Sequence, residues 1–417
     1  MFFLFDCDNF FVSCERIFRP DLKKRPVVVL SSNDGCVVSR SYEAKALPIA
    51  MGAPYFKIEK MLRGAGGVAL SSNFELYSDI SRRVMSLIRQ NCGAIQVYSV
   101  DEAFARLPDT GIDHFQLAVC IRRQILKEVG IPVSIGIAPT KTLCKVASSL
   151  AKSKAFDKVE ILTDPQRIRQ TLKNFEVENI WGIGRRLTPK LNFLGIFTAL
   201  ELQNSPLKMI RRNFGIPLEK TVMELNGRPC LDIEREETAQ SITVSRSFEH
   251  EISNFEQLEA IIAGFTDTAC RRLRAQNAAA GEIAVFLKTN RFRNQNGSSG
   301  GSYLVSLGSP CIHTGRFIAA MKYGLKQIFS SQETYKSAGI TLLAIESADA
   351  LQTSLFEKSA LPPEEQKLMQ TLDKLNAKLG ARTVFFAAQA LAPQKFVRSN
   401  FHSPAYTTSW QSLVNVH

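Results

Sequence analysis

The chain has 417 residues, 45% of them hydrophobic, and its 52 Lys and Arg against 39 Asp and Glu give a formal charge of +13. This hydrophobic content excludes a largely disordered chain, and the length predicts about three or four domains rather than one core. The basic surplus favours a polyanionic partner, most often nucleic acid, over the alternative of a merely basic enzyme.

The first part of the chain, residues 1–165, alternates strand and helix patterns. Apolar residues at helical spacing predict one helix from Thr140 to Lys152 and another over about residues 113–129. Short apolar runs predict strands at residues 2–8, 26–31, 95–100, 103–107 and 132–138.

The remainder divides into a helical part and a second mixed part. Residues 166–235 predict a small all-helical domain that ends in a charged linker at residues 232–238. From residue 240 the α+β pattern returns, and a further helix is expected over residues 364–379. The predicted strands of this mixed part are residues 241–247, 282–289, 303–307 and 339–345, and its predicted helices are residues 255–276 and 315–330.

Two acidic pairs, Asp6 with Asp8 and Asp101 with Glu102, each follow an apolar run. Asp6 and Asp8 would share one face of a strand, whereas Asp101 and Glu102 can serve one site only if the chain turns or bulges there. Crowded carboxylates stay ionised when divalent cations lie between them, and Mg²⁺ prefers such oxygens together with substrate phosphates. The two pairs together predict metal-assisted phosphoryl transfer; either pair alone would more simply be surface acids at strand ends.

Side chains suited to a nucleotide occur beside these acids. Phe10 and Phe11 follow the first pair, and we expect one in the core and the other beneath a nucleotide's sugar. On a helix, Tyr42 and Lys45 are neighbours that could hold a triphosphate, and Lys152 is a third phosphate candidate. An ordinary solvated helix face is the alternative for these three residues.

A glycine-hydrophobic-glycine turn, Gly182, Ile183 and Gly184, lies between two predicted helices. Such a turn lets backbone N–H groups approach a phosphodiester without reading bases. Arg185 and Arg186 follow at once, and these cations favour contact with the DNA backbone over a plain helix turn.

The ordered set of motifs resembles Y-family translesion DNA polymerases, and within that family the UmuC type, the catalytic subunits of bacterial DNA polymerase V. The resemblance extends over essentially the whole chain. Its residues are Phe5–Phe11, Ser13–Glu15, Arg25–Val29, Asn33–Val37, Glu43–Leu47, Tyr98–Phe104, 134–152, Trp181–Gly184, Leu375–Lys378 and Ser403–Thr408.

This resemblance implies a multidomain α+β polymerase shaped like a right hand. It implies low-fidelity translesion DNA synthesis in the SOS response to DNA damage, by two-metal nucleotidyl transfer with two Mg²⁺ ions. The implied parts are a ferredoxin-like palm (1–28 and 78–165), small fingers (29–77), a helix-hairpin-helix thumb (166–235), an α+β little finger (240–350) and a UmuC-type C-terminal region for clamp and partner binding (351–417).

The resemblance also assigns roles to residues. The catalytic metal ligands are Asp6, Asp101 and Glu102 with the carbonyl oxygen of Cys7, whereas Asp8 lies beside the site. Phe11 takes the position of a steric gate against the ribose 2′-hydroxyl, where the UmuC type has Tyr. The other nucleotide-binding positions are Phe10, Ser39, Tyr42, Lys45 and Lys152, and the DNA-binding ones are Gly182, Ile183, Gly184, Arg185 and Arg186.

A short peptide, Gln352 with Leu355 and Phe356, resembles the Q-x-x-L-F motif that docks on a sliding clamp. Primer-template DNA and dNTP are the implied substrates. The resemblance further suggests a UmuD′-like dimer and a RecA-like filament as partners, with no membrane.

Other features limit the alternatives. Nine cysteines without C-x-x-C spacing are typical of reduced thiols in a cytoplasmic protein, and no apolar stretch is long enough to span a bilayer. Another palm-type nucleotidyl transferase or a cyclase would share the acids but would need neither the glycine turn nor the clamp-like peptide. A non-catalytic DNA-binding subunit of a repair complex predicts the loss of a metal ligand, and Asp6, Asp101 and Glu102 are all present.

Overall fold

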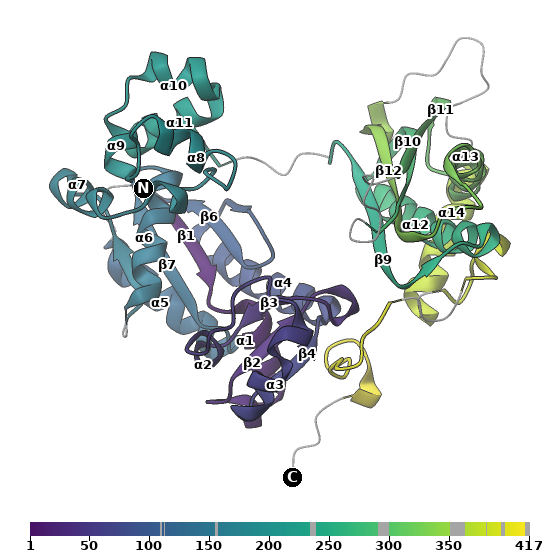
Figure 1. Cartoon of the computed structure of the whole chain (residues 1–417), viewed down its shortest axis with the longest axis horizontal. Helices are drawn as coiled ribbons and strands as arrows, with labels where there is room; N and C mark the ends of the chain where they lie inside the picture. The colour runs from purple at the N-terminus through teal and green to yellow at the C-terminus, as the bar shows by residue number, and fades with distance from the viewer. Residues whose placement is uncertain are drawn as a thin grey trace. The chain divides into compact units, whose positions relative to one another are not determined.

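The computed structural model describes residues 1–108, 111, 113–154, 157–233, 239–290, 300–350, 363–380, 382–392 and 397–412. The chain forms two compact units (Figure 1). The first comprises Met1–Ser31, Cys36–Glu236 and Phe401–His417, and the second comprises Ser32–Gly35 and Glu237–Asn400. Within the described residues, no helix has the length and apolar character needed to cross a membrane.

The first unit is built on a five-stranded sheet of order β5-β6-β1-β7-β8. β1 (Phe2–Cys7) lies at its centre, antiparallel to β6 (Glu102–Arg106) on one side and to β7 (Val133–Ala138) on the other. At the edges, β5 (Ile95–Val97) is antiparallel to β6, and β8 (Val159–Ile161) is parallel to β7. The strands predicted from the apolar runs of this part are therefore confirmed, with β5 shorter than expected.

Helices cover both faces of this sheet. One face packs against α4 (Phe74–Cys92) and α5 (His114–Glu128), and the other packs against α6 (Lys141–Ser153). Phe3 of β1 faces the first layer and Phe2 faces the second, both at most 2% exposed. Burial on two faces explains why β1 is continuously apolar rather than alternating.

α6 passes very close to β7. A Cβ atom on Gly136 would lie 2.3 Å from the carbonyl oxygen of Cys144 and 2.4 Å from the amide nitrogen of Ser148. Only glycine permits this approach, because any side chain would displace the helix backbone. The position of α6 matters for the site because the helix carries Lys145 and Lys152.

A smaller sheet of order β3-β2-β4 completes the mixed part of the first unit. β2 (Val27–Leu30) is antiparallel to β3 (Val37–Arg40) and parallel to β4 (Val68–Ser71). α2 (Tyr42–Lys45) and α3 (Tyr55–Gly64) contribute to the apolar cluster around it.

The part predicted to be all-helical is helical in the structure. Its buried leucines join the apolar cluster on the α6 side of the large sheet. Its helices are α7 (Pro165–Lys173), α8 (Thr188–Phe193), α9 (Ala199–Gln203), α10 (Leu207–Phe214) and α11 (Ile216–Leu225).

The second unit is a four-stranded antiparallel sheet of order β11-β10-β12-β9 with helices packed against it. Each strand is longer than the sequence predicted, and the predicted helices are present. The strands are β9 (Ile242–Ile252), β10 (Ala278–Lys288), β11 (Gly301–Cys311) and β12 (Tyr335–Ser347), and the helices are α12 (Phe255–Ala275), α13 (Thr314–Ile328) and α14 (Pro363–Leu379).

Candidate active site

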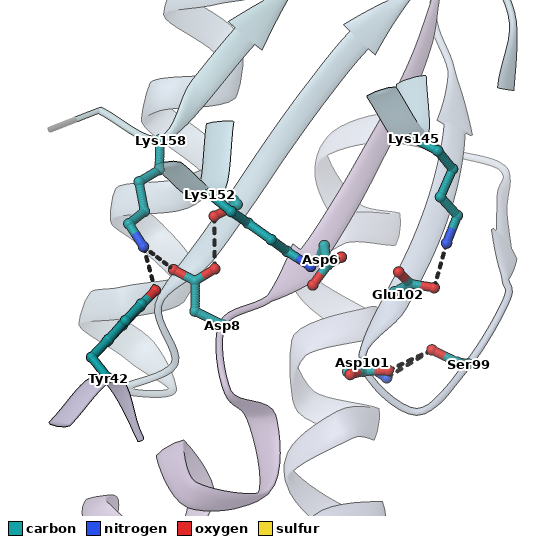
Figure 2. A network of polar contacts seen from close by, with 10 residues as sticks. Asp6, Asp8, Tyr42, Ser99, Asp101, Glu102, Lys145, Lys152 and Lys158 are labelled. Carbon is teal, nitrogen blue, oxygen red and sulfur yellow. Dashed lines mark hydrogen bonds and ion pairs between the residues drawn. The ribbon is translucent and has the colours of Figure 1, made fainter. Parts of the chain in front are cut away.

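The acids singled out in the sequence lie on two neighbouring strands. Asp6 on β1 is directly opposite Glu102 on β6. After β5 the chain turns through Ser99 and Asp101 before β6 begins, and the amide of Cys7 donates a hydrogen bond to the carbonyl of Asp101 at 2.9 Å. The turn that Asp101 and Glu102 need in order to serve one site is therefore present. It brings both acidic pairs to the same end of the sheet (Figure 2).

Each of these carboxylates accepts a hydrogen bond from its own donor (Figure 2). Within the described residues, no group of three or more His, Cys, Asp or Glu side chains is arranged closely enough to hold a metal ion. Two lysines of α6 supply positive charge to the acids instead. The pairs are Lys152 Nζ with Asp6 at 2.5 Å, Lys145 Nζ with Glu102 at 2.7 Å and Ser99 Oγ with Asp101 at 2.5 Å.

Asp6 is 5% exposed, and its burial raises its pKa to about 7 although Lys152 acts in the opposite direction. Burial by itself would lower the pKa of Lys152, but Asp6, Glu102 and Asp8 together outweigh that effect and raise it. Burial therefore disfavours the charged form of Asp6, and the positive charge of Lys152 offsets part of that cost. The oxygens of Asp6, Asp101 and Glu102 are the hard donors that Mg²⁺ prefers, so their chemistry fits such an ion.

Asp8 holds a different lysine. It lies just after β1, is 3% exposed, and accepts hydrogen bonds from Ser134 Oγ and from Lys158 Nζ, both at 2.7 Å. Lys158 also donates to the hydroxyl of Tyr42, and its Nζ lies 4.6 Å from the centre of the Tyr42 ring. Asp8 therefore fixes Lys158 against Tyr42, as a neighbour of the acidic set.

Several cations gather around this point. Tyr42 and Lys45 lie together on α2 as predicted, with Lys45 Nζ 5.1 Å from the Tyr42 ring centre. Burial lowers the pKa of Lys45, and the charges of Arg40, Lys152 and Lys158 lower it further. Such mutual repulsion marks a place where an anionic ligand would be stabilised. We call Arg40, Lys45, Lys152 and Lys158 the cation cluster.

Two members of the cation cluster were missed in the sequence. Arg40 ends β3, where no helical spacing marks it, and its guanidinium donates to the carbonyl of Ile49. Lys158 precedes β8 in a left-handed backbone conformation, φ 36°, and only the pairing of β8 with β7 carries it to Asp8. Ser39, predicted as a nucleotide contact, is 7% exposed within β3.

The two aromatic residues after the first acids differ in environment. Both begin α1 (Phe10–Phe18), where Phe10 is 3% exposed in the core and Phe11 is partly exposed. Phe11 stacks on Tyr77 with ring centres 4.5 Å apart and planes 13° apart, and it meets the exposed Phe74 edge-on at 6.0 Å. One aromatic ring is therefore in the core, as expected, and the other belongs to a partly exposed aromatic surface.

The glycine turn is formed as the sequence predicted. Gly182 has a φ of +87°, in the region that favours glycine, and Ile183 is buried at 5% exposure within the helical core. Gly184, Arg185 and Arg186 are exposed. The buried isoleucine holds the turn in place while its neighbours face solvent; contact with DNA stays a prediction.

The clamp-like peptide belongs to a part of the chain that the structure does not describe. Gln352, Leu355 and Phe356 lie outside the described residues, which are interrupted between Ala350 and Pro363. Their role stays a prediction from the sequence.

Known protein families and relatives match this chain over most of its length. Residues 5–149 match the impB/mucB/samB family, residues 239–355 match the C-terminal domain of that family, and residues 366–416 match a domain of unknown function. Protein UmuC of Salmonella typhimurium is 40% identical over 423 residues, covering 100% of each chain. DNA polymerase IV of Desulfatibacillum aliphaticivorans is 28% identical, covering 92% of this chain and 95% of that protein.

Among solved structures, a Y-family DNA polymerase chimera superimposes with a TM-score of 0.68 at 20% identity, covering 83% of this chain and 99% of the chimera. A crystal structure of DinB from Sulfolobus solfataricus superimposes with a TM-score of 0.54 at 21% identity, covering 82% and 98%. At these identities the likeness establishes the fold, which is the mixed α+β fold of Y-family DNA polymerases.

Proposed function

The chain belongs to the impB/mucB/samB family, and from this membership we propose that it is a Y-family DNA polymerase of the UmuC type. It extends a primer along a damaged template, using dNTP, in the response to DNA damage. The observation that carries this proposal is the juxtaposition of Asp6, Asp101 and Glu102 with the cation cluster at one end of the sheet. Acids and cations side by side suit the transfer of a nucleotide from its triphosphate.

The acids are assigned as the metal site. Asp6, Asp101 and Glu102 together with the carbonyl of Cys7 would hold two Mg²⁺ ions, because all of these ligands are hard oxygens. Bound there, the ions supply a lowered pKa for the primer 3′-hydroxyl and charge stabilisation for the leaving pyrophosphate. Lys152 lies 2.5 Å from Asp6, and transfer of this lysine from the acid to a phosphate would accompany binding of the substrate.

The cation cluster is assigned to the triphosphate. The positive charges of Lys45, Lys152 and Lys158 neutralise the negative charge of the bound triphosphate, and the hydroxyl of Tyr42 offers a further hydrogen bond. Asp8 keeps Lys158 in place through their 2.7 Å ion pair.

Phe11 is assigned to the sugar. A flat ring against the deoxyribose C2′ leaves no room for a 2′-hydroxyl, and its stacking on Tyr77 fixes the plane of that ring. Phe10 packs against Phe11 from the core, with ring centres 5.9 Å apart, and Ser39 stays assigned to the nucleotide.

We also propose DNA and protein partners. Gly182, Gly184, Arg185 and Arg186 are exposed and suit the DNA backbone. We assign Gln352, Leu355 and Phe356 to a sliding clamp, and we infer a UmuD′-like dimer and a RecA-like filament as activating partners in the SOS response.

Primer extension across an abasic template site tests this proposal. With Mg²⁺, dNTP, clamp, UmuD′ dimer and RecA filament present, the wild-type chain should extend the primer, and Asp101→Ala should lower the rate by about a hundredfold or more. Asp21→Asn is the matched control, because Asp21 is a half-exposed carboxylate paired with Arg19 outside the acidic set. Full extension by Asp101→Ala would show that the site assignment is wrong.

A further inference from the structure

The end of the chain is built into the first unit. Residues 401–408, here called the C-terminal strap, begin at β4: the amide of Ser71 donates to the carbonyl of Phe401, and the amide of Phe401 donates to Ser71 Oγ, both at 3.0 Å. Further on, Tyr406 is 7% exposed and stacks on Phe18 of α1 with ring centres 4.6 Å apart and planes 5° apart. The strap is therefore anchored at both of its ends.

Between the anchors, Ser403 is buried at 6% exposure. Its hydroxyl accepts a hydrogen bond from Asn73 Nδ2 at 2.9 Å and donates one to Glu15 Oε1 at 3.1 Å. Asn73 also caps the N-terminus of α4 by accepting a hydrogen bond from the amide of Leu76. Ser403 thus links the strap to both α1 and α4 in one buried network.

Glu15 continues the network toward the nucleotide site. It is 0% exposed, and the oxygen that binds Ser403 also accepts a hydrogen bond from the hydroxyl of Tyr77 at 2.8 Å. The ring of Tyr77 is the one that stacks on Phe11. Burying a carboxyl group is costly unless it is hydrogen-bonded, and both of these bonds converge on the same oxygen of Glu15, which ties Ser403 to Tyr77.

We propose that the C-terminal strap positions the Phe11 ring through Ser403, Glu15 and Tyr77, and thereby sharpens the exclusion of ribonucleotides. This inference rests on the assignment of Phe11 to the sugar under the proposed function. Repulsion between atoms in contact rises steeply, so a small shift of the Phe11 plane changes how strongly a 2′-hydroxyl is rejected. Residues 366–416 match a domain of unknown function, and their strap acquires a role in nucleotide selection.

Two substitutions cut the network at separate points and preserve the packing. Tyr77→Phe keeps the ring that stacks on Phe11 and removes the hydroxyl, and Ser403→Ala removes the hydroxyl on the strap. Each should lower the preference for dNTP over rNTP, measured as the ratio of kcat/KM in single-nucleotide incorporation, by about three- to tenfold. The double variant should be no worse than either single one, because both changes interrupt the same chain of contacts. Glu15→Gln keeps an acceptor oxygen and should retain most of the preference.

Control variants separate this inference from the proposed function. Trp410→Ala changes an 89% exposed residue just beyond the strap and should leave the preference unaltered. If Phe11→Ala does not admit rNTP, the sugar assignment of Phe11 is wrong. If Phe11→Ala admits rNTP while folded Tyr77→Phe and Ser403→Ala keep the wild-type ratio, the role of the strap is refuted. Thermal unfolding of each full-length variant shows whether it is folded. If Ser403→Ala is not folded, the dNTP to rNTP preference of Tyr77→Phe decides whether the inference holds.

Discussion

Lys158 donates to the Asp8 carboxylate and to the Tyr42 hydroxyl, so it connects the end of β1 with α2. Under the proposed function, Lys158→Ala removes a positive charge from the triphosphate site. The KM for dNTP should rise about tenfold or more, with a smaller change in kcat, in steady-state incorporation of a single nucleotide. Lys57→Ala removes an exposed lysine of α3 and serves as control. An unchanged KM in Lys158→Ala would show that Lys158 does not contribute to binding of the triphosphate.

Glu15 should make stability depend on pH. Burial raises its pKa above the ordinary value of 4.5, against the hydrogen bonds from Tyr77 and Ser403. Its Oε2 atom is buried without a hydrogen-bond partner in the described part of the chain. Between the unfolded and the higher folded pKa, the folded state holds the extra proton, so the free energy of unfolding falls as pH rises through that window.

Glu15→Gln removes this contribution. Its stability relative to the wild type should therefore increase as the pH rises above the ordinary pKa of about 4.5, as measured by urea unfolding. Other titrating groups cancel in the comparison because both chains carry them. A difference that stays constant with pH would show that Glu15 does not titrate in this way.

At the scale of elements, the close passage of α6 over β7 depends on Gly136. Gly136→Ala places a Cβ 2.3 Å from a backbone oxygen of α6, so the helix must move. We expect a loss of about 2–3 kcal/mol in the free energy of unfolding, and a lower activity because Lys145 and Lys152 move with the helix. Gly64→Ala at the end of α3 is the control, since its Cβ would meet nothing within 4 Å. Equal stability of the two variants would contradict the close contact.

The glycine turn of the helical part should contribute charge rather than sequence recognition. Replacing Arg185 and Arg186 together by Ala should weaken binding to all DNA sequences alike and reduce the dependence of log affinity on log salt concentration by about two. The double change of Arg82 and Arg83 to Ala removes the same charge from α4. Binding that weakens equally in both double variants would indicate a general charge effect instead of contact at the turn.

Agreement between prediction and structure is closest for individual elements. The apolar run of residues 2–5 and the helical spacing after Thr140 predicted β1 and α6, because each pattern repeats within a few residues. β5 ends earlier than predicted, since the turn that carries Asp101 interrupts the apolar run. Hydrophobic period therefore identifies an element well and its end poorly.

At the scale of the whole molecule, the chain's last segment belongs to its first unit. Tyr406→Ala removes a ring that is buried against Phe18, and it should lower the stability of the first unit by about 3 kcal/mol. Hydrogen exchange measures this locally: protection should fall in β1 and stay unchanged in β10 of the second unit. Trp410→Ala should alter neither. Equal loss of protection in β1 and β10 would show that the two units unfold together.

The sequence alone determined the residue types of the site and the local elements that carry them. Asp6, Asp101 and Glu102, the aromatic pair Phe10 and Phe11, and the helix with Tyr42 and Lys45 are all marked by patterns within a few residues. Such patterns are visible because secondary structure follows a short period along the chain.

Only the tertiary structure decided which of these groups meet. The opposition of Asp6 and Glu102, the contact of Lys158 with Asp8, and the bond between Ser403 and Glu15 join residues far apart in the chain. Strand register and the docking of the C-terminal strap select these pairs, and no local period encodes them. They form because burying the shared apolar core offsets the entropy lost in closing such long loops.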